Sequence, residues 1–391
     1  MKKWIGKLHL YLGLASGLIV FVISVTGCIL AFEQEIKAIT QPYMFTDEPV
    51  KGALLPPSKL AAYAEEALPG KKANGVLYDV PGRNAQVGFY NFDPEYYYVV
   101  YLNPVNGKVA HVWNEEGDFF HFILHGHYYL WLPEKIGQPV AASATLVFFV
   151  MLVSGMVLWW PKNKSAAKQR FSIKWTAAWR RKNYDLHNVL GFYIMSIGAI
   201  LALTGLVWGF QWFSQSVYTA TGGEGSDAYY NPTSDTTAIA NISAPAQATD
   251  RAWYALQKEY PSYKTLNISI PHLKSESIYS YTNFREGTYY HVDYNYFDQH
   301  SLKKIKATGP YSGKYSEANF AQKLRRMNYD IHVGAILGLP GKILMFFASL
   351  ICASLPVTGT LIWWGRKKKA PKVTRKSKQG TLKDKPYLVN R

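Results

Sequence analysis

Two histidines stand at the start of long apolar stretches and are followed by glycine at the same spacing. "LHLYLG" covers residues 8–13 and "LHNVLG" covers residues 186–191. Imidazole is a common metal ligand, and its charge changes near neutral pH. An isolated histidine at a membrane boundary is ordinarily an interfacial group. A histidine that recurs in the same local pattern is a candidate ligand.

The similarity between the two stretches extends well beyond these histidines. "LHLYLGLASGLIVFVISVTG" aligns without a gap to "LHNVLGFYIMSIGAILALTG", so that His9 matches His187. A second pair, "LHGHYYLWLPEK" and "IHVGAILGLPGK", matches His125 with His332. "GMVLWWPK" then aligns with "GTLIWWGR" after a short gap. The chain is therefore interpreted as two copies of one unit.

A parallel repeat in a membrane protein implies a pseudo-two-fold axis along the membrane normal. The axis would place His9 beside His187 near one face of the membrane, and His125 beside His332 near the other. Two imidazoles on facing helices can hold one haem iron from both sides. We therefore expect two haem b groups, with these four histidines as axial ligands.

Glycines accompany the expected inner ligands. Gly13 and Gly17 follow His9 at intervals of one helical turn, and Gly191 repeats this spacing after His187. Missing side chains would give a flat macrocycle room against the helix backbone. A small-residue motif for helix packing is the alternative interpretation.

The outer ligand is less clearly defined. "HFILHGH" places His121 and His125 on one helical face, whereas His127 points elsewhere on a helix. Only His125 has a counterpart in the aligned repeat. We take His125 as the expected ligand, and His121 as a supporting group or substitute ligand.

Composition indicates a membrane protein. His9–Phe32 contains no charged residue and is long enough to cross a bilayer, as are Val140–Trp160, Val189–Phe213 and Ile343–Trp364. The net charge of +17 is concentrated at residues 1–7, 162–182 and 366–391. The positive-inside rule assigns these basic segments and both termini to the cytoplasm. A role in nucleic-acid binding is not expected.

The expected organisation follows from this topology. It is a mainly α membrane protein, a four-helix transmembrane bundle made of two parallel repeats with two small α+β extracytoplasmic domains. The spans are 8–36, 139–161, 184–213 and, with an interfacial segment, 326–365. The extracytoplasmic domains are 37–117 and 214–325. An interfacial segment covers 118–135, and basic cytoplasmic segments cover 162–183 and 366–391.

The two cysteines, Cys28 and Cys352, lie in apolar segments, which excludes a disulfide framework. No C-x-x-C-H motif is present, so covalent haem attachment is not expected. "VTGC" (25–28) is compatible with a lipoprotein signal, but the preceding apolar run is long for one. We expect these residues to be retained as a span.

Taken together, these motifs resemble the PepSY-associated transmembrane proteins over nearly the whole chain. The resemblance rests on "LHLYLG...TG", "LHGHYYL", "GMVLWWPK", "LHNVLG...TG" and "IHVGAILGLPGK...TGTLIWW", with "YVVYLNPVNGKV" similar to the strand–turn–strand signature of the PepSY module. The family includes iron-regulated inner-membrane ferric-siderophore reductases. In those members, paired histidines at matching positions hold two b-type haems.

The expected function is therefore that of a dihaem electron-transfer protein in the bacterial inner membrane. It would reduce a periplasmic ferric siderophore or other ferric chelate with electrons from an external donor, because no G-x-G-x-x-G follows a strand. One alternative is a haemless PepSY regulator that binds a peptidase or another periplasmic protein. A second is a haem-binding or haem-transfer protein.

Overall fold

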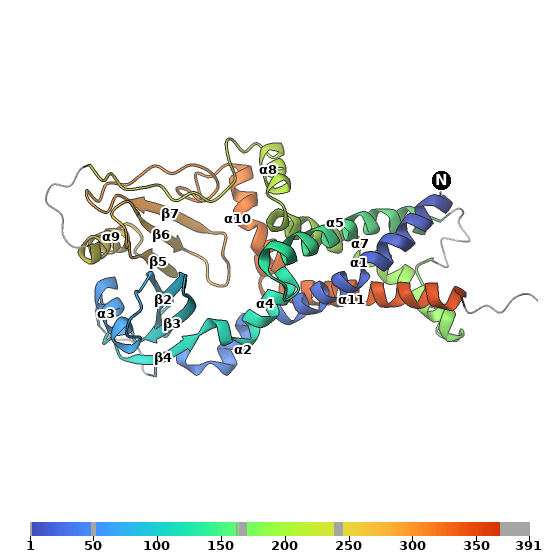
Figure 1. Ribbon diagram of the computed structural model, residues 1–391, viewed down its shortest axis with the longest axis horizontal. Coiled ribbons are helices and arrows are strands. Elements are labelled where there is room, and N and C mark those ends of the chain that lie inside the picture. Colours follow the sequence, from blue (N-terminus) through green and yellow to red (C-terminus); the bar gives the residue numbers. More distant parts are fainter. Residues whose placement is uncertain (1, 48–51, 162, 164–169, 238–244, 368–391) are drawn as a thin grey trace, which may run out of the picture.

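The computed structural model describes residues 2–47, 52–161, 163, 170–237 and 245–367. A long helical bundle and a domain built on a β-sheet lie end to end, with the N-terminus at the bundle end remote from the sheet (Figure 1). The expected basic tail (366–391) lies almost wholly outside the described residues, as does part of the basic loop (162–183). Below, "inner" means the bundle end near the N-terminus, and "outer" means the end next to the sheet.

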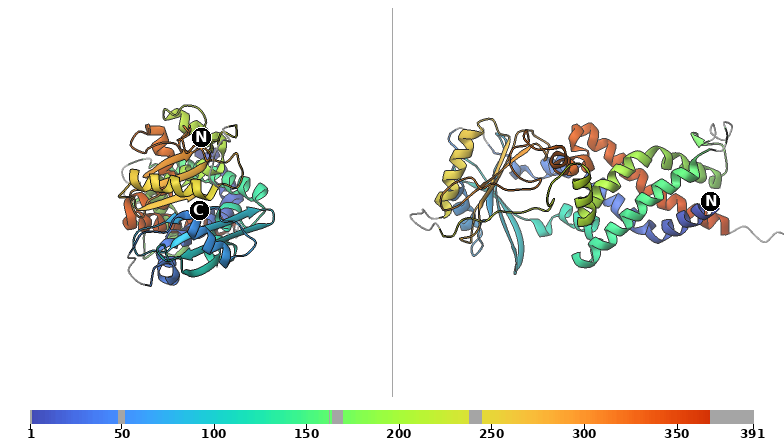
Figure 2. Two further views of the ribbon diagram at one scale, coloured as in Figure 1. Left: turned by 90° about the vertical axis from the view of Figure 1, so that its left-hand side faces the viewer. Right: turned by 90° about the horizontal axis from the view of Figure 1, so that it is seen from above.

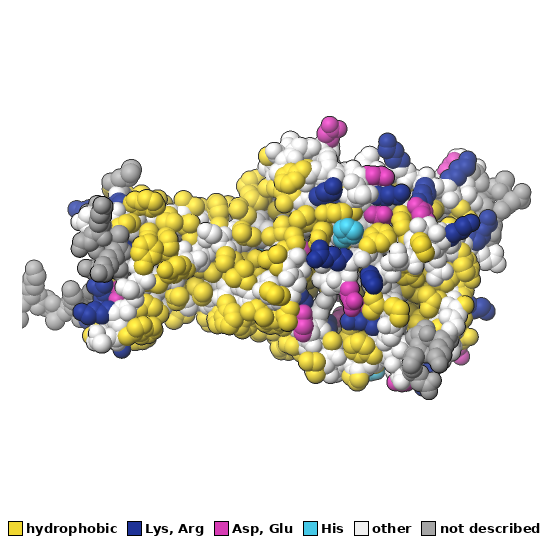
Figure 3. All heavy atoms as spheres, turned by 180° about the vertical axis from the view of Figure 1, so that it is seen from behind, with side chains coloured by type: hydrophobic (Ala, Val, Ile, Leu, Met, Phe, Trp, Pro, Cys, Tyr) yellow, Lys and Arg dark blue, Asp and Glu magenta, His cyan; other side chains and the backbone are white. Residues whose placement is uncertain are grey.

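Within the described residues, four helices are long and apolar enough to cross a membrane. They belong to α1 (Lys2–Leu30), α5 (Glu134–Trp159), α7 (Trp179–Gly209) and α11 (Gly338–Lys367). On the face seen in Figure 3, the surface of the bundle is almost entirely apolar, and charged side chains gather at the inner end and over the sheet domain. The protein is thus a multi-pass membrane protein, although its helices begin several residues before the expected spans.

The four helices form a closed ring. α1 packs against α5 and α11, and α7 packs against the same two helices. α1 and α7, which carry His9 and His187, therefore lie diagonally across the bundle. This arrangement allows side chains of two opposite helices to meet in the centre.

Shorter helices surround the outer end of the bundle (Figure 1). They are α2 (Glu33–Thr40), α4 (Phe119–Tyr129), α8 (Gln211–Ala220) and α10 (Phe320–Val333), with the 3₁₀ turns Pro42–Met44, Glu115–Gly117 and Ala335–Leu337. A capping box of Asn319 and Gln322 starts α10, and Gly334 ends it in the left-handed conformation.

The two expected extracytoplasmic domains share one seven-stranded antiparallel sheet with the order β4-β3-β2-β1-β5-β6-β7. The strands are β1 (Gly75–Tyr78), β2 (Ala85–Phe92), β3 (Glu95–Leu102), β4 (Val109–Asn114), β5 (Thr265–Ser269), β6 (Ile278–Asn283) and β7 (Val292–Phe297). β1 and β5 join the two chain segments, with Gly75 opposite Ser269. We expected two separate small domains, whereas the structure joins both segments in one sheet through β1 and β5.

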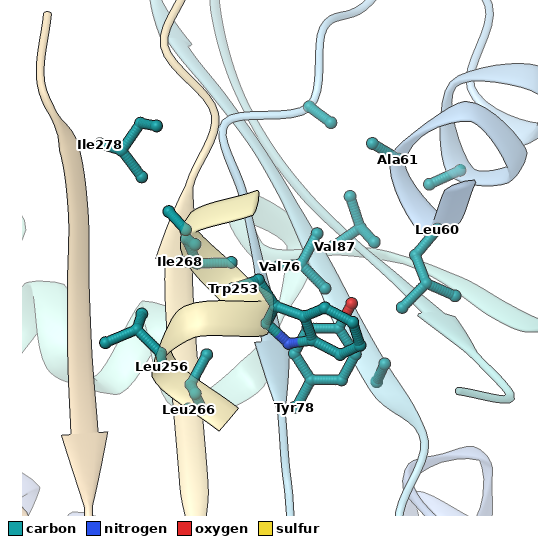
Figure 4. Packing of buried hydrophobic residues seen from close by; sticks show 14 of the residues in the cluster. Leu60, Ala61, Val76, Tyr78, Val87, Trp253, Leu256, Leu266, Ile268 and Ile278 are labelled. Atoms are coloured by element: carbon teal, nitrogen blue, oxygen red, sulfur yellow. The ribbon is translucent and has the colours of Figure 1, made fainter. Parts of the chain in front are cut away.

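Two helices, α3 (Pro57–Ala67) and α9 (Pro245–Glu259), cover the sheet face that points away from the bundle (Figures 1 and 2). Trp253 of α9 stacks on Tyr78 with ring centroids 5.1 Å apart, and both side chains are fully buried (Figure 4). Val76, Val87 and Ile268 complete this core beneath the helices. Burial of these apolar side chains holds the two chain segments together.

The opposite face of the sheet turns toward the bundle and is rich in tyrosine. Side chains alternate between the faces of a strand. On each strand, the residue next to a buried core residue such as Val76 or Val87 therefore points to this second face. These residues pair with one another across the strands and form one row. It comprises His111, Tyr101, Gln86, Leu77, Asn267, Tyr281 and Tyr294.

Candidate haem-binding site

At the outer end of the bundle, two histidines from different helices face one cavity. His127 of α4 and His332 of α10 have ring centroids 6.3 Å apart. Both line a cavity of 180 Å³. Burial lowers the pKa of His127 to about 4 and that of His332 to about 3, so both imidazoles are neutral at pH 7.

The structure thus places His127, and not His125, opposite His332. His125 is exposed on the other face of α4, where its ring lies 5.8 Å from that of His121. The reason is the helical period, because positions 121 and 125 share a face that positions 123 and 127 do not. Ile123 is accordingly buried. The expected pairing of His125 with His332 is corrected, and His121 also lies outside the cavity wall.

A polar cluster fixes α4 in this orientation. Asp118 caps the N-terminus of α4 by accepting a hydrogen bond from the backbone N–H of His121. The same carboxylate lies 2.9 Å from Lys37 Nζ on α2, and Lys37 also pairs with Glu33 at 2.8 Å. Lys342 of α11 pairs with Glu35 at 2.8 Å. These partly buried ion pairs hold the short outer helices against the transmembrane helices.

At the inner end, His9 of α1 and His187 of α7 line a second cavity of 420 Å³. The bundle therefore brings these two histidines, one from each of two opposite helices, to one cavity. Gly13, Gly17 and Gly191 all lie in the wall of this cavity. A Cβ added at Gly13 would lie 2.8 Å from Met151 Cε, so a side chain there would take up space inside the cavity.

Each of the four rings is held through its Nδ1 atom by a hydroxyl group of a neighbouring helix. Nδ1 lies 2.8–3.0 Å from the hydroxyl oxygen, in the pairs His9–Ser154, His127–Thr26, His187–Thr358 and His332–Thr204. Each hydroxyl donates its own proton to a backbone carbonyl one turn earlier in its helix. It can therefore only accept from Nδ1–H, which leaves Nε2 as the unprotonated nitrogen of each ring.

Two imidazoles in each cavity fit haem better than they fit a bare metal ion. Among the described residues, no group of three or more His, Cys, Asp or Glu could hold a metal ion. Haem needs only axial ligands from the protein, because the macrocycle supplies the other nitrogens. A metal lies about 2 Å from an imidazole nitrogen, so two axial rings have centroids about 6 Å apart. The outer pair has this separation.

The two cavities differ in polarity. Arg170, Arg366 and Asn188 line the inner cavity, where cationic side chains suit the carboxylates of a haem. The outer cavity is instead lined by Glu33, Gln138 and two tyrosines, and it is the smaller one. Phe148 and Val20 line both cavities and therefore lie between them.

Residues 7–366 match the family described as the PepSY-associated TM region. The chain belongs to this family. No curated protein matches the chain. Because the match covers all four membrane helices, both histidine pairs lie within the part of this PepSY-associated protein that defines its family.

Several residues at the histidine sites of this PepSY-associated protein were not predicted from the sequence. They are Ser154, Thr358, Arg170, Arg366 and Trp159, the last of which is buried in the inner cavity wall and stacks on Phe192. A sequence signal for the hydroxyls exists. A Ser/Thr–Gly step occurs in each membrane helix, at residues 26–27, 154–155, 204–205 and 358–359.

Proposed function

We propose that this protein is a dihaem transmembrane electron-transfer protein that reduces a ferric siderophore or another ferric chelate and thereby releases Fe²⁺ during iron uptake. The observation that carries the proposal is the presence of one imidazole pair at each end of the bundle, with every ring hydrogen-bonded to a hydroxyl group through Nδ1. Two haem b groups, when bound, would supply reversible one-electron chemistry. His9 and His187 would hold the inner one, and His127 and His332 the outer one.

Two sites at different depths suit transfer across a membrane. The hydrocarbon core of a bilayer is about 30 Å thick, so one site cannot serve both faces. Phe148 and Val20 separate the two cavities by a single layer of side chains. This thin partition keeps the two proposed carriers close together.

The direction of transfer follows from the proposed topology. In this proposed topology, which applies the positive-inside rule to the basic residues at 1–7 and 162–182, the inner end and both termini lie in the cytoplasm of a bacterium and the sheet lies outside its inner membrane. An external donor would deliver electrons at the inner cavity, from the cytoplasm or the membrane. A fluorescent reporter fused after Arg391 is expected to fold inside the cell, and activity of an export-dependent reporter at that position would contradict the topology.

Aromatic side chains connect the outer site with the surface below the sheet. The ring of Trp208 lies 5.3 Å from His332 and 6.2 Å from Tyr329, and Tyr329 lies 4.8 Å from Tyr289. Tyr329 lines the outer cavity and is also partly exposed, as is Tyr289. A chelate between this edge and the tyrosine-rich sheet face would be close to the outer site. One electron would convert its Fe³⁺ to Fe²⁺, which hard oxygen ligands hold less strongly.

Stopped-flow spectroscopy of the purified protein tests the activity. The protein is reduced with dithionite and mixed with ferric siderophores in the presence of a ferrous chelator. We expect rapid oxidation of the haem bands and matching formation of the ferrous complex. His332→Ala should abolish the fast phase, whereas the exposed His125→Ala should retain it. Oxidation no faster than that by air would exclude a reductase and favour a regulatory or haem-transfer role.

A further inference from the structure

The same contact between a hydroxyl group and an imidazole Nδ1 atom occurs at all four histidines of the two sites. Thr26 and Thr204 lie near the outer ends of α1 and α7 and hold the outer rings. Ser154 and Thr358 lie near the inner ends of α5 and α11 and hold the inner rings. Each contact joins two different helices.

The glycine after each hydroxyl residue serves the same ring. A Cβ added at Gly27, Gly155 or Gly359 would lie 3.3 Å from the Cε1 atom of His127, His9 or His187, and one at Gly205 would lie 3.6 Å from that of His332. The Cε1 edge of each imidazole thus packs against a helix at a position that has no side chain. Three of the four distances are too short for an alanine methyl group without a small shift of the ring.

Two buried asparagines strengthen this arrangement at two of the four rings, one in each cavity. Asn183 precedes His187 by one turn and donates to the backbone carbonyl of Thr358 at 3.0 Å. Asn328 has the same position before His332 and donates to the carbonyl of Thr204 at 3.1 Å. In both places one helix contacts its neighbour through the ring and through the amide, so the ring cannot shift along the neighbouring helix without breaking both bonds.

We propose that Thr26, Ser154, Thr204 and Thr358 are positioning residues that fix each imidazole as the Nδ1–H tautomer and aim Nε2 at the haem iron. This inference rests on the proposed function. A hydrogen bond from Nδ1–H makes imidazole a stronger donor to a metal, and its loss typically lowers metal affinity about 10- to 100-fold. A weaker donor favours the ferrous state, so the loss also moves the haem potential in the positive direction.

Isosteric substitutions test the proposal. Thr204→Val and Thr358→Val keep the side-chain shape but remove the hydroxyl acceptor, which leaves a backbone carbonyl, of Leu201 or Leu355, beside the ring. We expect about 10- to 100-fold weaker haem binding at the outer site for the first and at the inner site for the second. The potential of the affected haem should rise, and Thr→Ser at each position should restore both properties. Ser354→Ala and Thr40→Val are controls, because these residues line neither cavity and their hydroxyls donate to their own helices.

The outcomes separate this inference from the proposed function. Valine variants with the affinity and potential of the controls would overturn the positioning role while haem binding stands. A wild-type protein without haem would overturn the proposed function. In that case ¹⁵N NMR of histidine-labelled protein still decides the tautomers: Nδ1–H signals lost in the valine variants support the hydroxyl contacts, and unchanged spectra contradict them.

Discussion

The imidazole rings of His127 and His332 face one another across the outer cavity, with centroids 6.3 Å apart. We expect His127→Ala and His332→Ala to remove the same haem, and His9→Ala and His187→Ala to remove the other, because each change deletes one of the two imidazoles that would hold that haem. Haem content should fall from about two to about one per chain. Absorption and EPR spectra identify which centre remains.

Two histidines of α4 that lie outside the cavity wall provide the control for this experiment. His121→Ala and His125→Ala should each retain both haems, since neither side chain lines the outer cavity. Loss of the outer haem in His125→Ala, with retention in His127→Ala, would show that the assignment from the structure is wrong.

The arginines of the inner cavity are expected to bind haem carboxylates. Arg170→Gln or Arg366→Gln should weaken binding at the inner site about tenfold or more, because a hydrogen bond to a charged group contributes about 1.5–3 kcal/mol. Haem titration of the apoprotein measures this. The outer haem and the exposed Arg180→Gln variant serve as internal and matched controls. Equal weakening at both sites would contradict a local role.

The seam between β1 and β5 is expected to tolerate no side chain at Gly75. A Cβ there would lie 2.8 Å from the carbonyl oxygen of Ile268. Gly75→Val should therefore destabilise the sheet domain by about 1–3 kcal/mol, as overpacking does. Thermal unfolding followed by near-ultraviolet circular dichroism measures the change. Gly88→Ala, which meets nothing within 4 Å, should be much milder; equal effects would exclude the seam as the cause.

The sequence predicted the parts of the site that depend on local pattern. Apolar length identified the membrane helices, and the ungapped repeat paired His9 with His187. The repeat failed at His125 because the alignment was anchored on the Leu–Pro match that follows the histidines. In the second copy the 3₁₀ turn Ala335–Leu337 separates His332 from that match, so the spacing differs from that after His127.

The shared sheet could not be predicted from local pattern. β1 and β5 are far apart in the chain, and each segment alone has the alternation expected of a small separate sheet. Their pairing depends on the close approach at Gly75 and on Trp253 packing over Tyr78. Such long-range contacts leave no periodic signal in a single sequence.

The central claim is that each chain binds two haems between histidine pairs at opposite ends of the bundle. The pyridine haemochrome assay on the purified full-length protein, normalised to protein mass, tests it most directly. We expect a haem b to protein ratio close to two. A ratio near one would exclude one of the two sites, and a ratio near zero would contradict the account as a whole.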